Sequence, residues 1–300
     1  MRAHKLCYIF MSVLVCFWGL EYIIAKTALE VFDPLSLIFF KYFIGCITLL
    51  AVKLVIDRKW PLNKRQIPLL VLCVIFGDIL YYFGEYSALS YLSVAVVTIL
   101  LSFVPVLSVI IERVVFNKSP SFSMVVGIFA CIAGVALVIG VDFSHFKAGK
   151  IAGYALVCAA VVSWNVYNFL TMKLSASYKS LDLTLYQLIC TVILLLPYII
   201  GHLPDPVTLT AEAVGGVVYL GVVSSAMGFF IYVKSISVIG ATPCALFSTF
   251  MPVTAAFFGW LILGETLTWM QIFGGIVVVV SACVVISRKR RLELREAAEM

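Results

Sequence analysis

The stretch LLSFVPVLSVI, residues 100–110, has a counterpart later in the chain, LFSTFMPVTAA at residues 246–256. The two segments align with Pro105 on Pro252, a shift of 147 residues. Other residues align in the same order at a shift of 146 or 147: Trp18 with Trp164, Ser90 with Ser237, and Gly127 with Gly274. The shared order and spacing indicate that the chain contains one structural unit twice.

The whole chain is strongly apolar. Of its 300 residues, 63% are hydrophobic and 12% are charged, and the mean hydropathy is +1.13. A soluble globular protein is about half apolar and roughly a quarter charged. Because the apolar runs continue from one end to the other, the sequence predicts an integral membrane protein and excludes a soluble domain with a single anchor.

Ten apolar runs are long enough to cross a bilayer, which takes about 20 residues. They are 6–26, 35–56, 67–88, 92–113, 122–141, 151–173, 182–201, 213–233, 241–262 and 269–287. Lipid offers no hydrogen-bond partner to the backbone, so each run must be a helix. Residues 1–147 and 148–300 would each hold five helices, and an odd number inverts the second unit relative to the first. We therefore expect an all-α integral membrane protein with ten transmembrane helices in two inverted five-helix repeats.

The basic residues between the runs predict the orientation of the chain. With both termini in the cytoplasm, 17 of the 21 Lys and Arg residues lie on the cytoplasmic side and 3 on the opposite side, while Lys41 lies inside a run. Cytoplasmic loops of membrane proteins carry such an excess. We expect a multi-pass protein of the cell (plasma or inner) membrane with both termini cytoplasmic. The basic segment RKRR at 288–291 is then a topology signal, and we expect no nucleic-acid partner.

Nine cysteines raise the question of a metal or redox site. None forms a Cys-x-x-Cys pair, and none lies near a histidine at ligand spacing. All fall within or beside apolar runs, where cysteine behaves as a small hydrophobic residue. We expect no metal and no cofactor.

Several motifs resemble those of one transporter family. They are Phe17-Trp18-Gly19 in the first run, Pro-Val at 105–106 and 252–253, and LGETLT at 263–268 followed by Gly274-Gly275. Together with ten helices in two repeats, they are similar to the EamA-type members of the drug/metabolite transporter superfamily over nearly the whole chain. The resemblance implies a carrier that works by alternating access. It would move a small metabolite, often an amino acid or a related compound, without ATP.

Three positions depart from the family pattern. Residues 117–118 are Asn-Lys where the first repeat would echo the Gly-Glu pair of the second. Lys41 stands where the family commonly has arginine, and Glu21 stands where a neutral polar residue is common. These departures bear on the substrate class and not on the fold. Separately, the spacing of Thr268 and Gln271 predicts a capping box at the start of the last helix.

Four charged residues lie inside the predicted helices: Glu21, Lys41, Asp78 and Glu85. An ionised side chain at the bilayer centre costs on the order of 2.5–3.5 kcal/mol, so such residues usually face the bundle interior or a cavity. Residues at helical spacing share a face, which gives four stripes: Trp18, Glu21, Tyr22 and Ala25; Asp78, Tyr81, Tyr82 and Glu85; Trp164, Tyr167, Asn168 and Thr171; Ser225, Gly228, Phe229 and Tyr232. A cavity between the halves would therefore be aromatic throughout and acidic on one wall.

Such a cavity suits an ammonium group, because aromatic faces attract cations by up to about 2 kcal/mol when desolvated. We predict a secondary transporter for a small cationic or zwitterionic amine, choline-like or amino-acid-like, with protons as a candidate coupling ion. The predicted substrate-binding residues, between helices 1, 3, 4, 6, 8 and 9, are Trp18, Glu21, Tyr22, Asp78, Tyr82, Trp164, Tyr167 and Tyr232. Lys41 and Glu85 are assigned to coupling or charge balance, and Pro105 and Pro252 to helix kinks.

Alternatives stay open for several of these residues. Glu85 lies near a helix end and could extend to the membrane interface. Lys41 could serve only as the structural partner of Glu21 or Asp78, since a buried charge is normally paired. Asp78 could carry a proton instead of contacting substrate. The rival functions are a broad-specificity amino-acid or metabolite exporter, a channel, and a membrane-embedded enzyme, for which the sequence shows no clustered catalytic residues.

Overall fold

The computed structural model describes residues 2–116, 121–139, 148–203, 209–239, 244, 247 and 250–299, and its regular elements over these ranges are helices. Seven helical segments there are long and apolar enough to cross a membrane: Lys5–Ala28, Pro34–Ile56, Lys64–Leu89, Val94–Ile111, Lys150–Ser175, Ser180–Gly201 and Ala211–Ile239. Three shorter apolar helices accompany them, at Phe122–Leu137, Met251–Leu263 and Trp269–Val285. Each of the ten predicted runs therefore contains a helix, and the protein is a multi-pass membrane protein.

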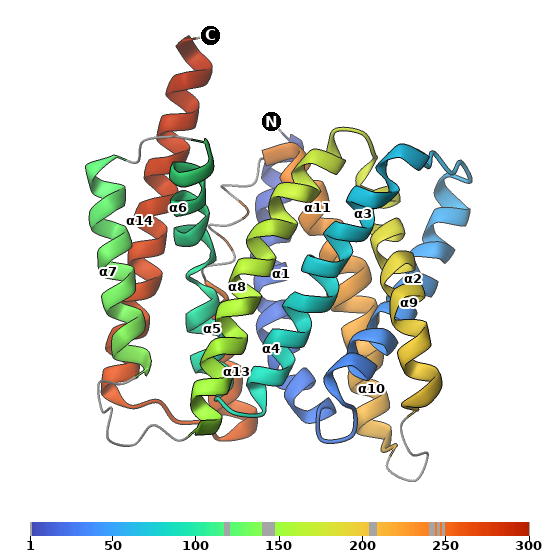
Figure 1. Cartoon of the computed structure of the whole chain (residues 1–300), viewed down its shortest axis with the longest axis horizontal. Coiled ribbons are helices and arrows are strands. Elements are labelled where there is room, and N and C mark those ends of the chain that lie inside the picture. Colours follow the sequence, from blue (N-terminus) through green and yellow to red (C-terminus); the bar gives the residue numbers. More distant parts are fainter. Residues whose placement is uncertain are drawn as a thin grey trace.

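The helices follow one another with short links. The elements are α1 (Arg2–Ala28), α2 (Pro34–Ile56), η1 (Lys64–Gln66), α3 (Ile67–Val74), η2 (Ile75–Leu80), α4 (Tyr81–Leu89), α5 (Val94–Leu101), α6 (Val104–Phe116), α7 (Phe122–Ile139), α8 (Ala148–Ser175), α9 (Ser180–Gly201), α10 (Ala211–Tyr219), η4 (Leu220–Gly228), α11 (Phe229–Ile239), α13 (Met251–Leu263) and α14 (Trp269–Glu299). The last helix continues well beyond the predicted end at residue 287 and projects from the bundle in Figure 1. The Asn-Lys pair at 117–118, residues 140–141 of the predicted fifth run, and residues 241–243, 245–246 and 248–249 of the predicted ninth run lie outside the described residues.

Two of the long helical segments contain a π-helical stretch at their middle. The first is η2, between α3 and α4, and the second is η4, between α10 and α11. A shift of 147 residues moves 75–80 onto 222–227, which lies within η4. A π turn holds more residues than an α turn and is often found at functional sites. The extra residue changes the angular position, around the helix axis, of the residues after the π turn relative to those before it.

Both repeat-matched prolines stand at the second residue of a helix. A break after α5 precedes Pro105, since α5 ends at Leu101 and α6 begins at Val104. Pro252 likewise follows the first residue of α13. Proline is tolerated there, because the first N–H groups of a helix have no partner within the helix. At the first proline the structure thus shows a break between two helices where the sequence predicted a kink within one.

Helices from the two halves of the sequence alternate in the packing. The most extensive helix pairs join a helix from before residue 147 to one from after it: α7 with α14, α1 with α13, α2 with α9, α2 with η4, and α4 with α8. Figure 1 shows α7 and α14 side by side at one edge of the bundle, and both chain ends on the same side of it. The two halves are therefore interlocked, and neither forms a bundle of its own.

Short local motifs define the ends of several helices. Asp33 caps α2 by accepting hydrogen bonds from the backbone N–H groups of Leu35 and Ser36. The predicted capping box is confirmed: Gln271 Oε1 accepts from the Thr268 N–H at 3.0 Å, and Thr268 Oγ1 accepts from the Gln271 N–H at 3.2 Å. These contacts satisfy backbone donors that the first turn of a helix leaves without partners.

Candidate functional site

A pocket lies in the middle of the bundle between six of the predicted spans. It holds about 690 Å³ of empty space, its open mouth included. Its lining comes from α1, α4, the α5–α6 segment, α8, α11 and α13: Trp18, Glu21, Tyr22, Tyr81, Tyr82, Glu85, Thr98, Leu101, Ser102, Val104, Pro105, Trp164, Asn168, Tyr232 and Met251. These helices are the first, third, fourth, sixth, eighth and ninth of the predicted spans, the same six named from the sequence.

Most of the residues predicted to bind substrate line this pocket. Those that do are Trp18, Glu21, Tyr22, Tyr82, Trp164 and Tyr232. Asp78 and Tyr167 are buried but are not among the lining residues. The π turn explains the position of Asp78, because Asp78 lies inside η2 whereas Tyr82 and Glu85 follow on α4. The regular spacing assumed from the sequence does not hold across a π turn.

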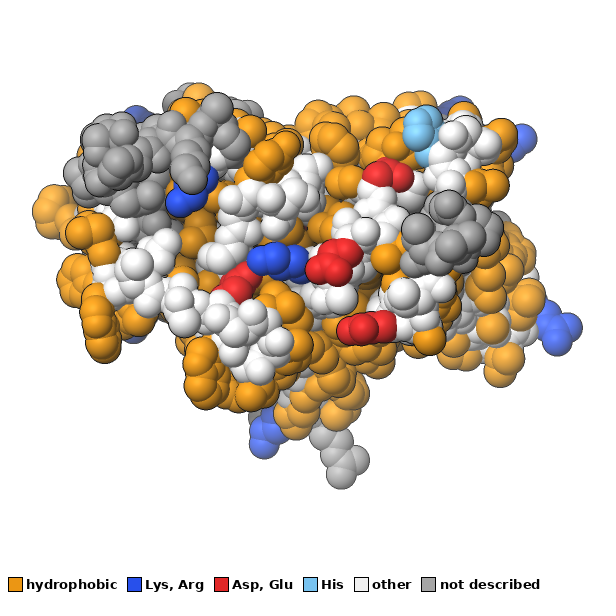
Figure 2. Space-filling model, turned by 90° about the horizontal axis from the view of Figure 1, so that it is seen from below, with side chains coloured by type: hydrophobic (Ala, Val, Ile, Leu, Met, Phe, Trp, Pro, Cys, Tyr) orange, Lys and Arg blue, Asp and Glu red, His pale blue; other side chains and the backbone are white. Residues whose placement is uncertain are grey.

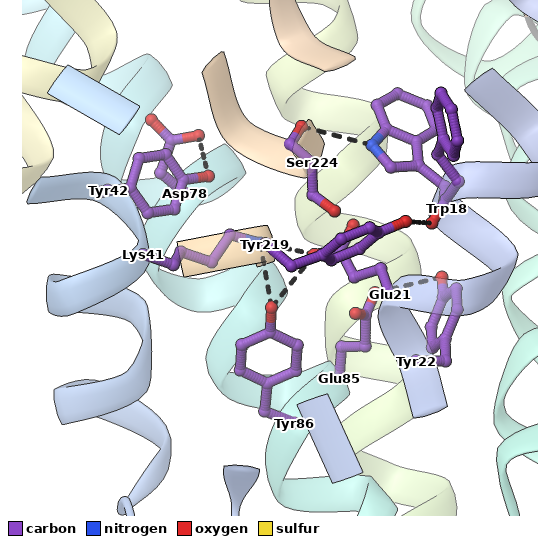
Figure 3. A network of polar contacts seen from close by, with 11 residues as sticks. Trp18, Glu21, Tyr22, Lys41, Tyr42, Asp78, Glu85, Tyr86, Tyr219 and Ser224 are labelled. Atoms are coloured by element: carbon purple, nitrogen blue, oxygen red, sulfur yellow. Dashed lines mark hydrogen bonds and ion pairs between the residues drawn. The ribbon is translucent and has the colours of Figure 1, made fainter. Parts of the chain in front are cut away.

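Glu21 and Lys41 form a buried ion pair. Lys41 Nζ lies 2.6 Å from Glu21 Oε1, and both side chains are almost fully buried. The hydroxyl of Tyr86 accepts a hydrogen bond from Lys41 at 2.9 Å and donates one to Glu21 at 3.1 Å. Figure 3 shows these three side chains meeting from α2, α1 and α4. Glu21, which the sequence predicted to bind substrate, therefore already has a cationic partner.

Glu85 lies in a different environment. Its side chain is 1% exposed and lines the pocket, so the interface position considered from the sequence is wrong. Tyr22 on α1 donates a hydrogen bond to Glu85 Oε2 at 3.4 Å (Figure 3). Among the described residues, no Lys or Arg forms an ion pair with Glu85. A buried ionised carboxylate without a cation is costly, so this position suits either a bound cation or a proton.

Asp78 lies deeper, between α2 and α9. Its carboxylate accepts hydrogen bonds from the Tyr42 hydroxyl at 2.9 Å and from Thr191 Oγ1 at 3.0 Å. A second polar contact joins α9 to α8, where Gln187 Nε2 donates to Thr171 Oγ1 at 3.4 Å. The hydrogen-bond donors to Asp78 among the described residues are thus neutral hydroxyls, and Asp78 does not line the pocket.

Six of the fifteen residues that line the pocket are aromatic. The ring centroids of Trp164 and Tyr81 are 4.5 Å apart, and those of Trp18 and Tyr232 are 5.4 Å apart. Tyr167 supports the wall from behind, stacked on Trp164 at 4.8 Å. A side chain in place of Gly77 would collide with the Tyr167 ring, so this close packing requires glycine there. The wall is therefore closely packed and rich in π faces.

The sequence missed some pocket residues and one further ion pair. Tyr81 and Asn168 belong to the predicted stripes but were not selected, and Asn168 Oδ1 accepts a hydrogen bond from Tyr232 at 3.3 Å. The α5–α6 segment and α13 contribute Thr98, Leu101, Ser102, Val104 and Met251. These residues are uncharged, so nothing in the sequence distinguishes them from lipid-facing residues. Identifying them requires knowing which face of the fourth and ninth helices points toward the pocket.

The further ion pair lies away from the pocket, at the end of α2. Lys53 Nζ lies 2.5 Å from Asp182 Oδ1 on α9, and each side chain is 1% exposed. Asp57 lies 3.6 Å from the same ammonium. Hydrogen bonds from the Lys59 backbone N–H and from Lys179 hold the pKa of Asp57 below its usual value. Because Lys53 is buried, this cluster joins α2 to α9 in a fixed position.

At the opposite end of the bundle, Glu265 joins three segments through one ion pair and one hydrogen bond. Lys26, on the last turn of α1, lies 2.6 Å from Glu265 Oε1 in the link between α13 and α14. The same oxygen accepts a hydrogen bond from the backbone N–H of Val94, the first residue of α5, at 3.2 Å. Figure 2 shows acidic and basic side chains gathered near the middle of this face, with apolar side chains around its rim. The contacts hold α1, α5 and α13 together there.

Comparison with known proteins identifies the family. The model of the EamA-like transporter family matches residues 5–140 and again residues 151–287. The chain belongs to the EamA-like transporter family. Two consecutive matches agree with a repeated unit, and membership of this family makes the protein a membrane transporter and not an enzyme.

Individual relatives are distant but cover nearly the whole chain. An uncharacterized transporter of Archaeoglobus fulgidus is 25% identical over 286 residues, which span 94% of this chain and 99% of that protein. A protein of Streptantibioticus cattleyicolor named as a probable terminal-alkyne amino-acid exporter is 25% identical over 240 residues, 79% of this chain and 78% of its own. One crystal structure superposes with a TM-score of 0.69 at 18% identity, covering 98% of this chain and 99% of that chain. That likeness shows a shared fold.

Proposed function

We propose that this protein is a secondary transporter for small organic amines, cationic or zwitterionic, and that it works by alternating access. The observation that carries the proposal is the position of Glu85. This carboxylate faces an aromatic pocket, and among the described residues its hydrogen-bond partners are the hydroxyls of Tyr22 and Tyr81 and no cation. A substrate ammonium would supply the missing charge and would also contact aromatic faces.

The charges at the pocket favour a single ammonium. Glu21 is neutralised by Lys41, which leaves Glu85 as the net negative charge of the lining. An amine with one positive charge balances it, whereas an anionic metabolite would add a second negative charge in a place of low dielectric. A zwitterion would need a donor for its carboxylate, and the side-chain amide of Asn168 is a candidate in the lining.

The proposed architecture is ten transmembrane helices in two inverted repeats, residues 1–147 and 148–300. The two family matches support it, as do the π segments η2 and η4 at equivalent places. Because helices of the two halves interlock in pairs, the parts that move during transport contain helices of both halves.

The proposed orientation places both termini in the cytoplasm of a cell with the protein in its plasma or inner membrane. The distribution of 17 basic residues against 3 supports it, and both ends lie on one side of the bundle in Figure 1. A fluorescent protein that folds only in the cytoplasm, fused after residue 300, should fluoresce. A periplasmic reporter fused at the same place should stay inactive, and the reverse result would contradict this orientation.

Protons are the candidate coupling ion. Glu85 and Asp78 are buried acids that accept hydrogen bonds from neutral hydroxyls, and each could hold a proton while the substrate site is empty. If substrate and proton compete at Glu85, an inward-directed proton gradient would drive amine out of the cell. Efflux from proteoliposomes with and without a pH gradient tests this, since an uncoupled carrier would show equal initial rates.

The second candidate is a broad-specificity amino-acid or metabolite exporter. The relative named as a probable amino-acid exporter favours it, and in that case Glu21 only pairs with Lys41. A thermal-shift screen of the purified protein against amines, amino acids and nucleosides separates the two functions. Stabilisation by simple monoamines supports amine transport, whereas stabilisation by amino acids alone supports the exporter.

A further inference from the structure

The ammonium of Lys41 occupies a position that suits a substrate ammonium. Lys41 Nζ lies 3.5 Å from the centre of the Tyr82 ring and 2.6 Å from Glu21 Oε1. Tyr82 and Glu21 both line the pocket, whereas Lys41 itself is fully buried and is not a lining residue. Figure 3 shows the lysine reaching across from α2 toward Glu21. A cation on an aromatic face beside a carboxylate is the arrangement by which proteins bind amines.

Three contacts hold this ammonium in place. Besides the ion pair and the Tyr82 ring, Lys41 donates a hydrogen bond to the Tyr86 hydroxyl at 2.9 Å. Tyr86 in turn donates to Glu21 at 3.1 Å. A lysine ammonium has three N–H donors. Here Glu21, the Tyr86 hydroxyl and the Tyr82 ring surround the ammonium, so its position is well defined. The lysine therefore satisfies one of the two carboxylates that line the pocket.

We infer that Lys41 is a specificity-determining residue: its side chain occupies the place of a second substrate ammonium and so restricts the pocket to substrates with one positive charge. This inference rests on the proposed amine transport. A diamine could place one ammonium at Glu85, but its second ammonium would meet a neutral Glu21–Lys41 pair. That second charge would lose its hydration without a compensating anion, which disfavours binding. Selectivity against diamines thus follows from a residue that does not line the pocket.

Replacing Lys41 by methionine tests the inference, because methionine has a similar length and no charge. In Lys41→Met, Glu21 and the Tyr82 face become available to a second ammonium. The probes are aminobutane and diaminobutane, which have the same carbon chain and differ by one ammonium. Binding to purified full-length protein can be followed by tryptophan fluorescence, since Trp18 and Trp164 line the pocket. The affinity ratio of diaminobutane to aminobutane should rise about tenfold or more over wild type.

Two further variants separate selectivity from structural damage. Lys53→Met removes an equally buried lysine from an ion pair outside the pocket, and its affinity ratio should equal that of the wild type. Glu21→Gln/Lys41→Met removes the anion as well, so the gain for diaminobutane should disappear. All variants are compared below their unfolding temperatures and as single gel-filtration peaks. If Lys41→Met does not fold, Lys41→Gln keeps a donor toward Glu21 and tests the same gain.

The outcomes distinguish this inference from the function on which it rests. A wild-type protein that binds aminobutane, with an unchanged ratio in folded Lys41→Met or Lys41→Gln, overturns the role of Lys41 alone. A gain that persists in Glu21→Gln/Lys41→Met also overturns it. Absence of aminobutane binding to the wild type contradicts amine transport itself, and the inference with it.

Discussion

Glu85 Oε2 lies 3.4 Å from the hydroxyl of Tyr22, and this contact joins α4 to α1 at the wall of the pocket. Glu21, on the same face of α1 as Tyr22, is instead paired with Lys41. The two carboxylates of the pocket therefore differ in what they can do. One is part of a closed ion pair, and the other is available to a ligand.

The first prediction concerns the charge of Glu85. Glu85→Gln keeps the size and a hydrogen-bond acceptor but removes the negative charge, so amine affinity should fall by about tenfold or more. Isothermal titration of the purified variant with a monoamine measures the change. Glu212→Gln, at an exposed position in the first turn of α10, should bind like the wild type. Equal affinity in both variants would remove Glu85 from the substrate site.

A second prediction concerns the aromatic wall. Trp164 packs between Tyr81 and Tyr167, and indole is the strongest of the aromatic partners for a cation. Trp164→Phe should weaken amine binding by a small factor, whereas Trp164→Leu should weaken it by about tenfold. Titration with a quaternary amine checks this order. Equal affinities for the phenylalanine and leucine variants, with both folded, would mean that Trp164 contributes to packing and not to cation binding.

A third prediction concerns stability. Lys53→Met leaves Asp182 buried without its cation, which should destabilise the folded protein by about 3–5 kcal/mol. Lys179→Met is the matched control, because that lysine is 77% exposed in its contact with Asp57 and should change stability by less than about 1 kcal/mol. Thermal unfolding in detergent compares the two variants. A similar unfolding temperature for both would show that the buried pair contributes little.

A fourth prediction concerns the end of the bundle where Glu265 joins three segments. Glu265→Gln removes the charge that pairs with Lys26, so α1, α5 and α13 should separate there more often. In a cysteine-free background, Thr98→Cys in the pocket should then react faster with a membrane-impermeant thiol reagent added from outside. Lys150→Gln is a control on an exposed position of α8. An unchanged rate in Glu265→Gln would show that this ion pair does not limit access.

The sequence predicted the helices well because span length and backbone hydrogen bonding leave few alternatives in lipid. The Thr268–Gln271 capping box was predictable for a similar reason, since it depends only on neighbours along the chain. Local rules thus account for the helices and for their ends.

The position of Asp78 shows where this reasoning stops. Regular helical spacing put it on the face of Tyr82, but the π turn of η2 places it against Tyr42 and Thr191 instead. A π turn has no simple sequence signal. The pairing of Lys53 with Asp182, 129 residues away, could not be predicted either, because it depends on which helices become neighbours.

The most direct test of the central claim is counterflow of a radiolabelled monoamine such as choline in proteoliposomes. Vesicles loaded with unlabelled amine should accumulate label transiently and saturably with the wild-type protein. Glu85→Gln vesicles should not, while Glu212→Gln vesicles should match the wild type. Absence of amine counterflow with the wild type, together with full transport of another metabolite by Glu85→Gln, would contradict the account.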